Sequence, residues 1–278
     1  MLSSDRPMLA DKIHISDSVR SYSCIAGEGG SLALRTRVLP EETPIALVYE
    51  GSTEAVLMAT PADLEDFAVG FSLNEGVVEG CKDITDFAAI HGEYGVELRM
   101  WLASGLSERH RQRRRRLVGP TGCGLCGIES LAEAVRPIPR VVSEVHFPEV
   151  CIADSLAALA KHQTLNHQTH ATHAAGFYVP DGNLIIREDV GRHNALDKLA
   201  GALSLRSIDP ARGAIVLTSR VSVEMVQKAA QIGAPILIAI SAPTGLAVQT
   251  AERANITLVA VARGNSYQLF SHAERIER

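Results

Sequence analysis

The stretch that decides the fold runs from Gly213 to Ala262 and reads GAIVLTSRVSVEMVQKAAQIGAPILIAISAPTGLAVQTAERANITLVAVA. Its three apolar runs, GAIVLTS, PILIAIS and ITLVAVA, alternate with two segments of helical periodicity, SVEMVQKAAQIG and GLAVQTAERAN. Continuous apolar strands that alternate with amphipathic helices are typical of parallel sheets covered on both faces. We therefore predict an α/β layer structure, which the strand NLIIRE and the helix GRHNALDKLAGALSL extend toward the N-terminus.

The loops after these strands are candidate ligand sites, because parallel sheets bind ligands beyond the carboxyl ends of their strands. They are SRVS at Ser219 to Ser222, SAPTG at Ser241 to Gly245 and ARGNS at Ala262 to Ser266. Small and hydroxyl residues with Arg220 and Arg263 suit phosphate groups. Loops of this composition also occur without a ligand, so both interpretations remain open.

A second group of ionisable residues surrounds the start of the helix GRHNALDK: Asp189, Arg192, His193, Asp197 and Lys198. A histidine and an aspartate one turn apart usually lie on a solvated helix face. Because five ionisable residues gather at the end of one strand, a functional site is an equally reasonable interpretation. The histidine in THAA is expected to be a buried structural residue.

The N-terminal half predicts a smaller unit. Residues 1–40 show no clear period and read as an arm or an irregular lead-in, so we expect order to begin near Thr43. IALVYE and EAVLMAT flank Gly51 and Ser52 as in a β-hairpin, and short apolar runs from residue 81 to 101 predict further strands.

A helix is predicted after this hairpin. Thr60 is the expected N-cap, and Pro61 fits the first helical position. Apolar residues then recur at i, i+3, i+4 and i+7 and predict one stripe against the hairpin: Leu64, Phe67, Ala68 and Phe71. Gly76 is the predicted end of the helix.

Composition indicates a globular protein of 278 residues, 46% of them hydrophobic. The three prolines of RPIPRVVSEVHFPEV predict a boundary between two domains, residues 1–145 and 146–278. The net charge of −5 argues against general nucleic-acid binding, although HRQRRRR at His110 to Arg116 creates a local positive field. That run fits a solvated loop and an anion-docking or partner-docking segment equally well.

The N-terminus lacks the features of a secretory signal, and no apolar run approaches the roughly 18 residues of a membrane span. We therefore expect a cytoplasmic protein without membrane contact. Five cysteines are present, and in a reducing compartment a CxxC pair is more often metal-binding or reactive than structural.

The CxxC pair is Cys123 and Cys126, in GPTGCGLCGIES. A structural zinc site needs four ligands, and no second CxxC is present, so no metal is expected. A catalytic zinc site remains an alternative, because His91 and Glu93 precede the pair as in the signature of zinc nucleoside deaminases. However, HGEYG reads better as a turn between strands.

Sulfur chemistry is the other interpretation of the pair. A helix is predicted to begin near Gly127, and a helix N-terminus together with arginines lowers the pKa of a thiol. Activated thiols of this kind can accept sulfur as a persulfide. A tether of irregular sequence suits a thiol that visits two sites better than it suits a thioredoxin-like redox pair.

Five motifs, in this order and at these intervals, resemble the FdhD family of formate dehydrogenase accessory proteins: TPADLEDFAVGFSLNEG, GPTGCGLCGIES, THAAGFYV, EDVGRHNALDK and TSRVSVEMVQKAA. The resemblance begins near Pro44 and covers nearly all of the remaining chain. Members of that family are sulfurtransferases. They take sulfur from a cysteine desulfurase and pass it to the molybdenum cofactor, bis(molybdopterin guanine dinucleotide), before its insertion into formate dehydrogenase.

The resemblance implies roles for particular residues. It makes Cys123 the persulfide carrier and Cys126 its neighbour in the motif, and it places the cofactor contacts at Val261, Ala262, Arg263, Gly264, Asn265 and Ser266. It also implies a C-terminal cytidine-deaminase-like α/β layer domain beside the smaller N-terminal α+β domain. A homodimer is expected. A zinc deaminase and a non-catalytic cofactor chaperone remain the alternatives.

Overall fold

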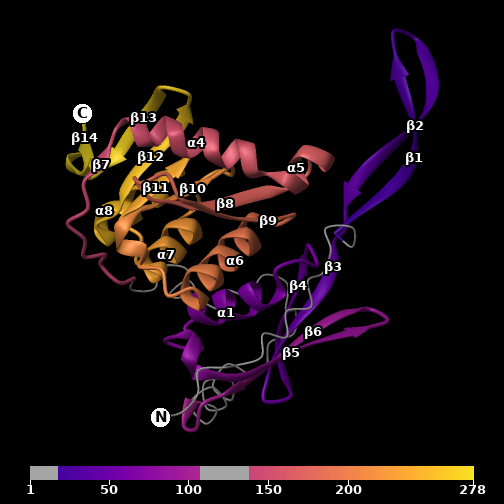
Figure 1. The fold of residues 1–278 in the computed structure, drawn as a ribbon, viewed down its shortest axis with the longest axis horizontal. Coiled ribbons are helices and arrows are strands. Elements are labelled where there is room, and N and C mark those ends of the chain that lie inside the picture. The colour runs from indigo at the N-terminus through magenta and orange to yellow at the C-terminus, as the bar shows by residue number, and fades with distance from the viewer. Residues whose placement is uncertain (1–17, 107–137) are drawn as a thin grey trace.

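A computed structural model describes residues 18–106 and 138–278 (Figure 1). Two sheets with helices between and outside them form the body of the protein. Helix α4 covers one face of a six-stranded sheet, and α6, α7 and α8 cover the other. Helix α1 packs on the outer side of α6, and a four-stranded sheet packs on α1 (Figure 1). The α/β fold class is confirmed.

The six-stranded sheet has the order β13-β12-β11-β10-β8-β9. Its strands are β8 (His173–Tyr178), β9 (Leu184–Asp189), β10 (Ala214–Leu217), β11 (Ile236–Ala239), β12 (Thr257–Arg263) and β13 (Ser266–Ser271). Its helices are α4 (Val150–His162), the short α5 (Thr164–Thr169), α6 (Arg192–Leu205), α7 (Val223–Ile232) and α8 (Gly245–Ala254).

The predicted alternation of strands and helices is confirmed, and β10, β11 and β12 pair in parallel. The sequence prediction missed that this sheet is mixed. Strand β8 lies between β9 and β10 and is antiparallel to both, and β13 is an antiparallel edge strand. Two antiparallel strands can be joined by a short turn without a helix. The helical periodicity of the segments between strands therefore does not reveal which strands pair antiparallel.

Alternate side chains of each central strand enter different cores. Ile215 and Leu217 pack against α6, α7 and α8, whereas Ala214 and Val216 pack under α4. Strands that are buried on both faces must be apolar at every position. This explains why the three apolar runs between Gly213 and Ala262 are continuous and do not alternate between apolar and polar residues.

The four-stranded sheet has the order β4-β3-β6-β5. Its strands are β3 (Thr43–Tyr49), β4 (Ser52–Ala59), β5 (Ile84–Gly92) and β6 (Gly95–Leu102), and α1 (Leu64–Asn74) covers one face. The hairpin at Gly51 and the turn HGEYG are confirmed. The apolar stripe of α1 packs on the sheet as predicted, and Gly76 follows the helix with a positive φ of 66°.

The predicted start of α1 is wrong. The helix begins at Leu64 and not at Pro61, and its N-cap is Asp63. Thr60 is fully buried and bonds to the other half of the protein instead: its amide donates to Asp189, and its hydroxyl accepts from the amide of Val190. A tertiary contact has taken the polar groups that would otherwise cap the helix.

Residues 18–40 form an arm, which was one of the two expectations, but the expected lack of regular structure before Thr43 is wrong for these described residues. Strands β1 (Val19–Glu28) and β2 (Ser31–Pro40) form an antiparallel hairpin that projects from the body (Figure 1). Gly29 and Gly30 both have positive φ, as a two-residue hairpin turn requires. Because most of its side chains are exposed, the hairpin lacks the strict alternation that marks a half-buried strand.

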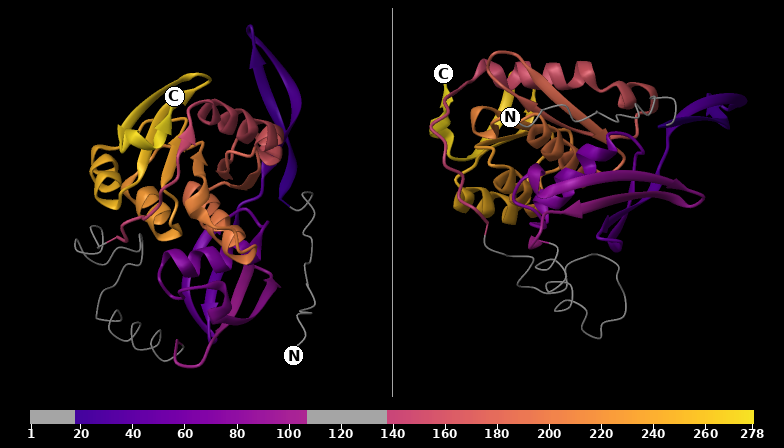
Figure 2. Two further views of the ribbon diagram at one scale, coloured as in Figure 1. Left: turned by 60° about the vertical axis from the view of Figure 1, so that its left-hand side comes forward. Right: turned by 60° about the horizontal axis from the view of Figure 1, so that its bottom comes forward.

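Helices α1 and α6 cross with their backbones in contact, at Gly70 and Gly201. A Cβ atom at Gly70 would lie 1.7 Å from the carbonyl oxygen of Asp197, and one at Gly201 would lie 1.9 Å from that of Asp66. Only glycine fits such a crossing. Figure 2 shows the two helices side by side from both directions, so the two halves share a close junction.

Short elements complete the fold: β7 (Phe147–Pro148) pairs in parallel with β14 (Ile276–Glu277), and 3₁₀ turns lie at Cys81–Asp83, Pro210–Arg212 and Ala273–Arg275. The predicted boundary between residues 145 and 146 stays a prediction. Within residues 18–106 and 138–278, no helix has the length and apolar character to cross a membrane.

Candidate functional site

The three predicted loops lie together at one edge of the six-stranded sheet. They follow β10, β11 and β12, which are parallel neighbours. The start of β8 lies at the same edge, because β8 runs antiparallel to β10. We call this region the carboxyl edge: residues 172–174, 190–193, 218–224, 240–245 and 261–266.

Backbone hydrogen bonds join these loops in a row. Val221 donates to the carbonyl of Ala242 over 3.3 Å, and Thr244 donates back to Val221 over 3.0 Å. Val261 donates to the carbonyl of Ser241 over 3.3 Å. At the other end, the hydroxyl of Thr218 accepts from the amide of Ala174 over 2.9 Å. The loops therefore form one continuous surface.

Val261 adopts a left-handed backbone conformation with φ of 52°. A β-branched residue rarely adopts this region, and the cost is about 1–3 kcal/mol. The register of β12 against β13 also shifts between Ala260 and Arg263. Strain and a bulge occur together at the start of the segment Val261–Ser266 that the resemblance implied for cofactor binding, and bulges are common beside functional sites.

The carboxyl edge is rich in positive charge. The N-termini of α6, α7 and α8 all follow strands that end there, so their positive dipole ends face this region. Arg220 and Arg263 are exposed, and neither is paired with a carboxylate in the part of the chain that the structure describes. The Nε atom of Arg192 is shielded from solvent and has no partner among those residues. Such groups can bind an anion.

Two histidines lie at this edge. His193 contacts Glu224 through Nε2 at 2.8 Å, which joins the first turns of α6 and α7. Burial lowers the pKa of His193, as do Lys228 and Arg192, and Glu224 opposes this shift. Burial and then Arg192 lower the pKa of His173, which is half-buried and not fully buried as we predicted.

The structure separates the predicted ionisable cluster into two parts. Arg192 and His193 lie at the carboxyl edge, but Asp189, Asp197 and Lys198 are buried at the junction of the two halves. Lys198 contacts Asp189 at 2.7 Å, and both side chains are 0% exposed. These three residues therefore hold the halves together.

Other polar contacts extend this junction. Lys198 also donates to the carbonyl of Thr60 over 2.9 Å. Asp197 accepts from Lys228 over 2.6 Å and from Asn74 of α1 over 2.7 Å. Buried charges are tolerated only when they are paired and hydrogen-bonded. The network therefore joins α1, α6 and α7 at the junction.

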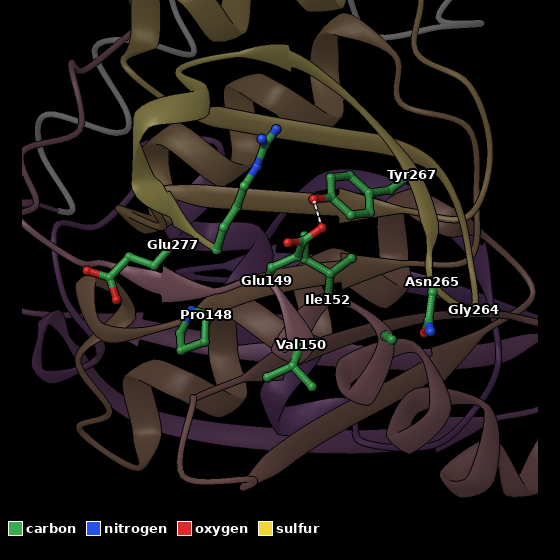
Figure 3. Close-up of a pocket in the computed structure, with 10 residues that line it drawn as sticks. Pro148, Glu149, Val150, Ile152, Gly264, Asn265, Tyr267 and Glu277 are labelled. Carbon is green, nitrogen blue, oxygen red and sulfur yellow. Dashed lines mark hydrogen bonds between the residues drawn. The ribbon is translucent and has the colours of Figure 1, made fainter.

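A cavity of about 520 Å³ adjoins the turn between β12 and β13. It lies between that turn, the start of α4 and the C-terminal residues (Figure 3). The lining residues are Pro148, Glu149, Val150, Ile152, Ala153, Gly264, Asn265, Tyr267, Glu277 and Arg278. Gly264 and Asn265 belong to the implied cofactor segment, so this segment meets a hollow of the size that holds small molecules.

Several residues that we expected at a functional site lie away from the carboxyl edge or outside the described residues. Cys123, Cys126 and the arginine run lie outside the described residues. His91 and Glu93 are exposed in the hairpin of β5 and β6, at the far sheet. Residues 18–106 and 138–278 contain no group of three side chains suited to a metal ion. The zinc alternative depends on the two cysteines and stays a prediction.

Sequence reasoning missed Glu149, Tyr267 and Glu224. Tyr267 directly follows the implied segment, and this proximity was a usable signal. Glu149 lies in the stretch that we interpreted as a domain boundary, and Glu224 reads as an ordinary acidic residue of a first helical turn. Only the tertiary structure brings these residues to the cavity and to His193.

A mixed sheet with small, basic loops at the carboxyl ends of its parallel strands is typical of α/β proteins that bind phosphate-containing ligands. The model of the FdhD/NarQ family matches residues 40–277. The chain belongs to this family.

Individual relatives agree with this assignment. The sulfur carrier protein FdhD of Agrobacterium fabrum is 49% identical over 95% of this chain and 98% of its own. That of Cupriavidus necator is 47% identical over 89% and 86%, respectively. A crystal structure of a formate dehydrogenase accessory protein from Desulfotalea psychrophila aligns with a TM-score of 0.75 at 25% identity, covering 93% of this chain and 99% of that one.

Proposed function

We propose that this protein is a sulfur carrier that supports formate dehydrogenase, with Cys123 as the carrying residue. The observation that carries the proposal is the family match over residues 40–277, together with an anion-suited carboxyl edge at the segment that the resemblance implies for cofactor binding. The partners are a cysteine desulfurase as donor and formate dehydrogenase as the final client. The protein acts in the cytoplasm as a homodimer.

Sulfur loading is a thiol exchange. The Cys123 thiolate attacks the outer sulfur of a persulfide on the desulfurase, a new S–S bond forms on Cys123, and the donor cysteine leaves as a thiolate. Cys126 is a second thiol in the same motif. If it is ionised, it can attack the inner sulfur of the loaded Cys123, close a disulfide and release the outer sulfur as sulfide. We therefore expect loading to proceed without Cys126.

The receiving group in this proposal is bis(molybdopterin guanine dinucleotide), bound as a client. When bound, the cofactor would supply a reduced molybdenum that accepts the sulfur as a sulfido ligand: the S–S bond on Cys123 would break, the metal would provide the two electrons, and Cys123 would return to a thiolate. The described residues suit the anionic part of the cofactor, because Arg263 and Arg220 are exposed without a carboxylate partner, and the backbone at Gly264 permits close approach. The segment Val261–Ser266 would hold the cofactor while the thiol delivers sulfur.

The loading step is tested by incubation of the full chain with a cysteine desulfurase and cysteine, followed by mass spectrometry. We expect one added sulfur on Cys123, none in Cys123→Ala, and retained loading in Cys126→Ala. Formate dehydrogenase activation should follow the same order in a strain that lacks the accessory protein. Full activation by Cys123→Ala would show a chaperone, and near-stoichiometric zinc in protein purified without chelator would favour the deaminase alternative.

Cofactor binding is tested separately with GDP as the probe in calorimetry. Arg263→Ala should weaken GDP binding by about 1.5–3 kcal/mol, the range for a charge-assisted hydrogen bond, and leave persulfide formation normal. Arg253→Ala is the matched control, because Arg253 is an exposed arginine in the last turn of α8, at the opposite edge of the sheet. Equal GDP affinity in the parent and in Arg263→Ala would contradict a role for Arg263.

A further inference from the structure

The arm, residues 18–40, has two different faces. Residues that pair directly across two strands point to the same face, and successive residues point to opposite faces. The register of β1 against β2 therefore places all charged side chains of the hairpin on one face: Arg20, Glu28, Arg35 and Arg37. The opposite face, which we call the apolar face, carries Ile25, Leu32, Leu34 and Val38.

The charged face of the arm turns toward its own chain. Arg37 donates to the carbonyl of Thr169 in α5 over 3.5 Å, which holds the root of the arm on the body. The apolar face therefore turns away from the body, and Leu32 and Leu34 are each 77% exposed. A two-stranded hairpin is only marginally stable in water unless it packs against another surface. The apolar face therefore requires a surface to pack against.

The four-stranded sheet offers such a surface on the side opposite to α1. One row of register partners crosses all four strands on that side: Val56, Ala46, Glu97 and Ile90. Trp101 points the same way, because its neighbour Met100 is buried in the core beneath α1. We call this side the outer face, and its exposed large apolar residues are Val56, Met58, Ile90 and Trp101. Exposed apolar surface of this kind marks an interaction site.

We propose that the arm of one copy packs its apolar face on the outer face of a second copy of this chain, which returns the same contact. The two surfaces are complementary in polarity, because both are mainly apolar. Ser23 and Thr36 also place hydroxyl groups on the apolar face. These can hydrogen-bond the ion pair of Arg99 with Glu97, which lies on the outer face with 2.7 Å between Nη2 and Oε2. The inference rests on the proposed function only for the homodimer and is independent of the sulfur chemistry.

The direction of the arm favours a second copy over the sheet of its own chain. Glu41 and Glu42 alone separate β2 from β3. The arm continues away from the body, so its tip points away from the outer face of its own chain (Figure 1, Figure 2). A two-fold axis between two copies turns each arm toward the other chain, and both contacts are then identical.

The size of the surfaces favours two reciprocal contacts. Two strands of ten residues each, at about 3.3 Å per residue and about 4.8 Å between strands, give the arm a face of about 300 Å². Reciprocal packing of arm on sheet buries four such faces, about 1,200 Å², which reaches the range of stable protein interfaces. Contact between the two arms alone would bury about half of that area and fall below this range.

The oligomeric state of the full chain, measured by sedimentation velocity, tests this interface. The parent should be a dimer, and Leu34→Lys on the arm and Val56→Glu on the sheet should each weaken dimerisation at least about 100-fold. Each change buries a lone charge at two symmetry-related contacts, and about 1.4 kcal/mol at each contact gives this factor. Val142→Lys is the matched control and should dimerise like the parent, because Val142 is an exposed apolar residue outside both surfaces.

A mixture of the two variants separates reciprocal exchange from other dimers. A heterodimer of Leu34→Lys with Val56→Glu regains one parental contact, between the unchanged arm of the second variant and the unchanged sheet of the first. An equimolar mixture should therefore dimerise at least about tenfold more tightly than either variant alone, since one of the two contacts no longer buries a lone charge.

Trp101 provides a local readout of the same contact. It is the one tryptophan of the chain and lies on the outer face, so the arm of the second copy should shield it from water. Its fluorescence emission should shift to longer wavelength in Leu34→Lys, although the substitution is on the arm and not on the sheet. Val142→Lys should keep the emission of the parent.

Three results would overturn the inference. A monomeric parent would leave both surfaces to a different protein. A Val56→Glu protein that dimerises like the parent would assign the dimer to the arms alone, and unchanged Trp101 emission in Leu34→Lys would show that no arm covers the sheet. Circular dichroism like that of the parent shows that the variants are folded. Persulfide loading of Cys123, measured on the same samples, reports separately on the sulfur-carrier function, and its absence in the parent would contradict that function whatever the oligomeric state.

Discussion

The crossing of α1 and α6 predicts that Gly201→Ala destabilises the protein, although alanine is the better helix former. The new Cβ would lie 1.9 Å from the carbonyl oxygen of Asp66 and 2.7 Å from its carbonyl carbon. Ordinary van der Waals contact begins near 3.4 Å, so the helices must separate by about 1.5 Å. The opposing atoms belong to a helix backbone, and no side-chain rotation can relieve the overlap.

The magnitude follows from two opposing terms. Overpacking costs about 1–3 kcal/mol, and a clash with backbone lies at the upper end of that range. Replacement of glycine by alanine inside a helix gains about 1 kcal/mol. The expected net loss is therefore about 2 kcal/mol in the free energy of unfolding. Separation of the helices would also lengthen the contacts of Asn74 with Asp197 and of Arg187 with Asp66.

Urea unfolding provides the assay. Circular dichroism reports on both halves, and the fluorescence of Trp101, the one tryptophan of the chain, reports on the four-stranded sheet. Gly245→Ala is the matched control, because this glycine begins α8 and a Cβ there meets nothing within 4 Å. We expect that control to be neutral or slightly stabilising. A Gly201→Ala protein as stable as the parent would refute the close crossing.

Two further predictions concern the buried charges and the histidines. Lys198→Met should lower the free energy of unfolding in urea by about 3–5 kcal/mol, because it leaves the Asp189 carboxylate without its buried cation. The double variant with Asp189→Asn should recover part of that loss. A loss below about 1 kcal/mol in Lys198→Met would contradict the buried pair. The lowered pKa of His193 means that the unfolded chain binds more protons below about pH 6.5. The free energy of unfolding should therefore fall as the pH falls from about 6.5 toward 5, and less so in His193→Gln than in the exposed control His146→Gln; parallel pH profiles for both variants would rule this out.

Much of the fold could be predicted from the sequence because it depends on local periodicity. The three apolar runs after Gly213 predicted strands, the segments between them predicted helices, and the loops at residues 219–222, 241–245 and 262–266 were placed at one edge by strand direction alone. Parallel neighbours must end at the same side of a sheet. The family resemblance added expected roles for Cys123 and the segment Val261–Ser266, which no periodicity could supply.

Contacts between residues far apart in the chain decided the features that the sequence did not predict. Thr60 has the local signal of a helix cap, but its hydroxyl accepts from the amide of Val190, and its backbone amide and carbonyl bond to the buried Asp189 and Lys198. An unpaired buried charge costs more than a lost cap. The sequence has no local sign of this choice, because residues 60 and 189 meet only when α1 packs on α6.

By itself, the sequence determined the order of strands and helices from Leu184 to Arg263, the direction of the parallel strands and the composition of the loops that follow them. The tertiary structure alone decided that β8 separates β9 from β10, that an acidic cavity adjoins a basic edge, and that Glu149 and Tyr267 meet across 118 residues. The physical reason is that hydrophobic periodicity reports which face of an element is buried, whereas the identity of its neighbours depends on packing between segments distant in the chain.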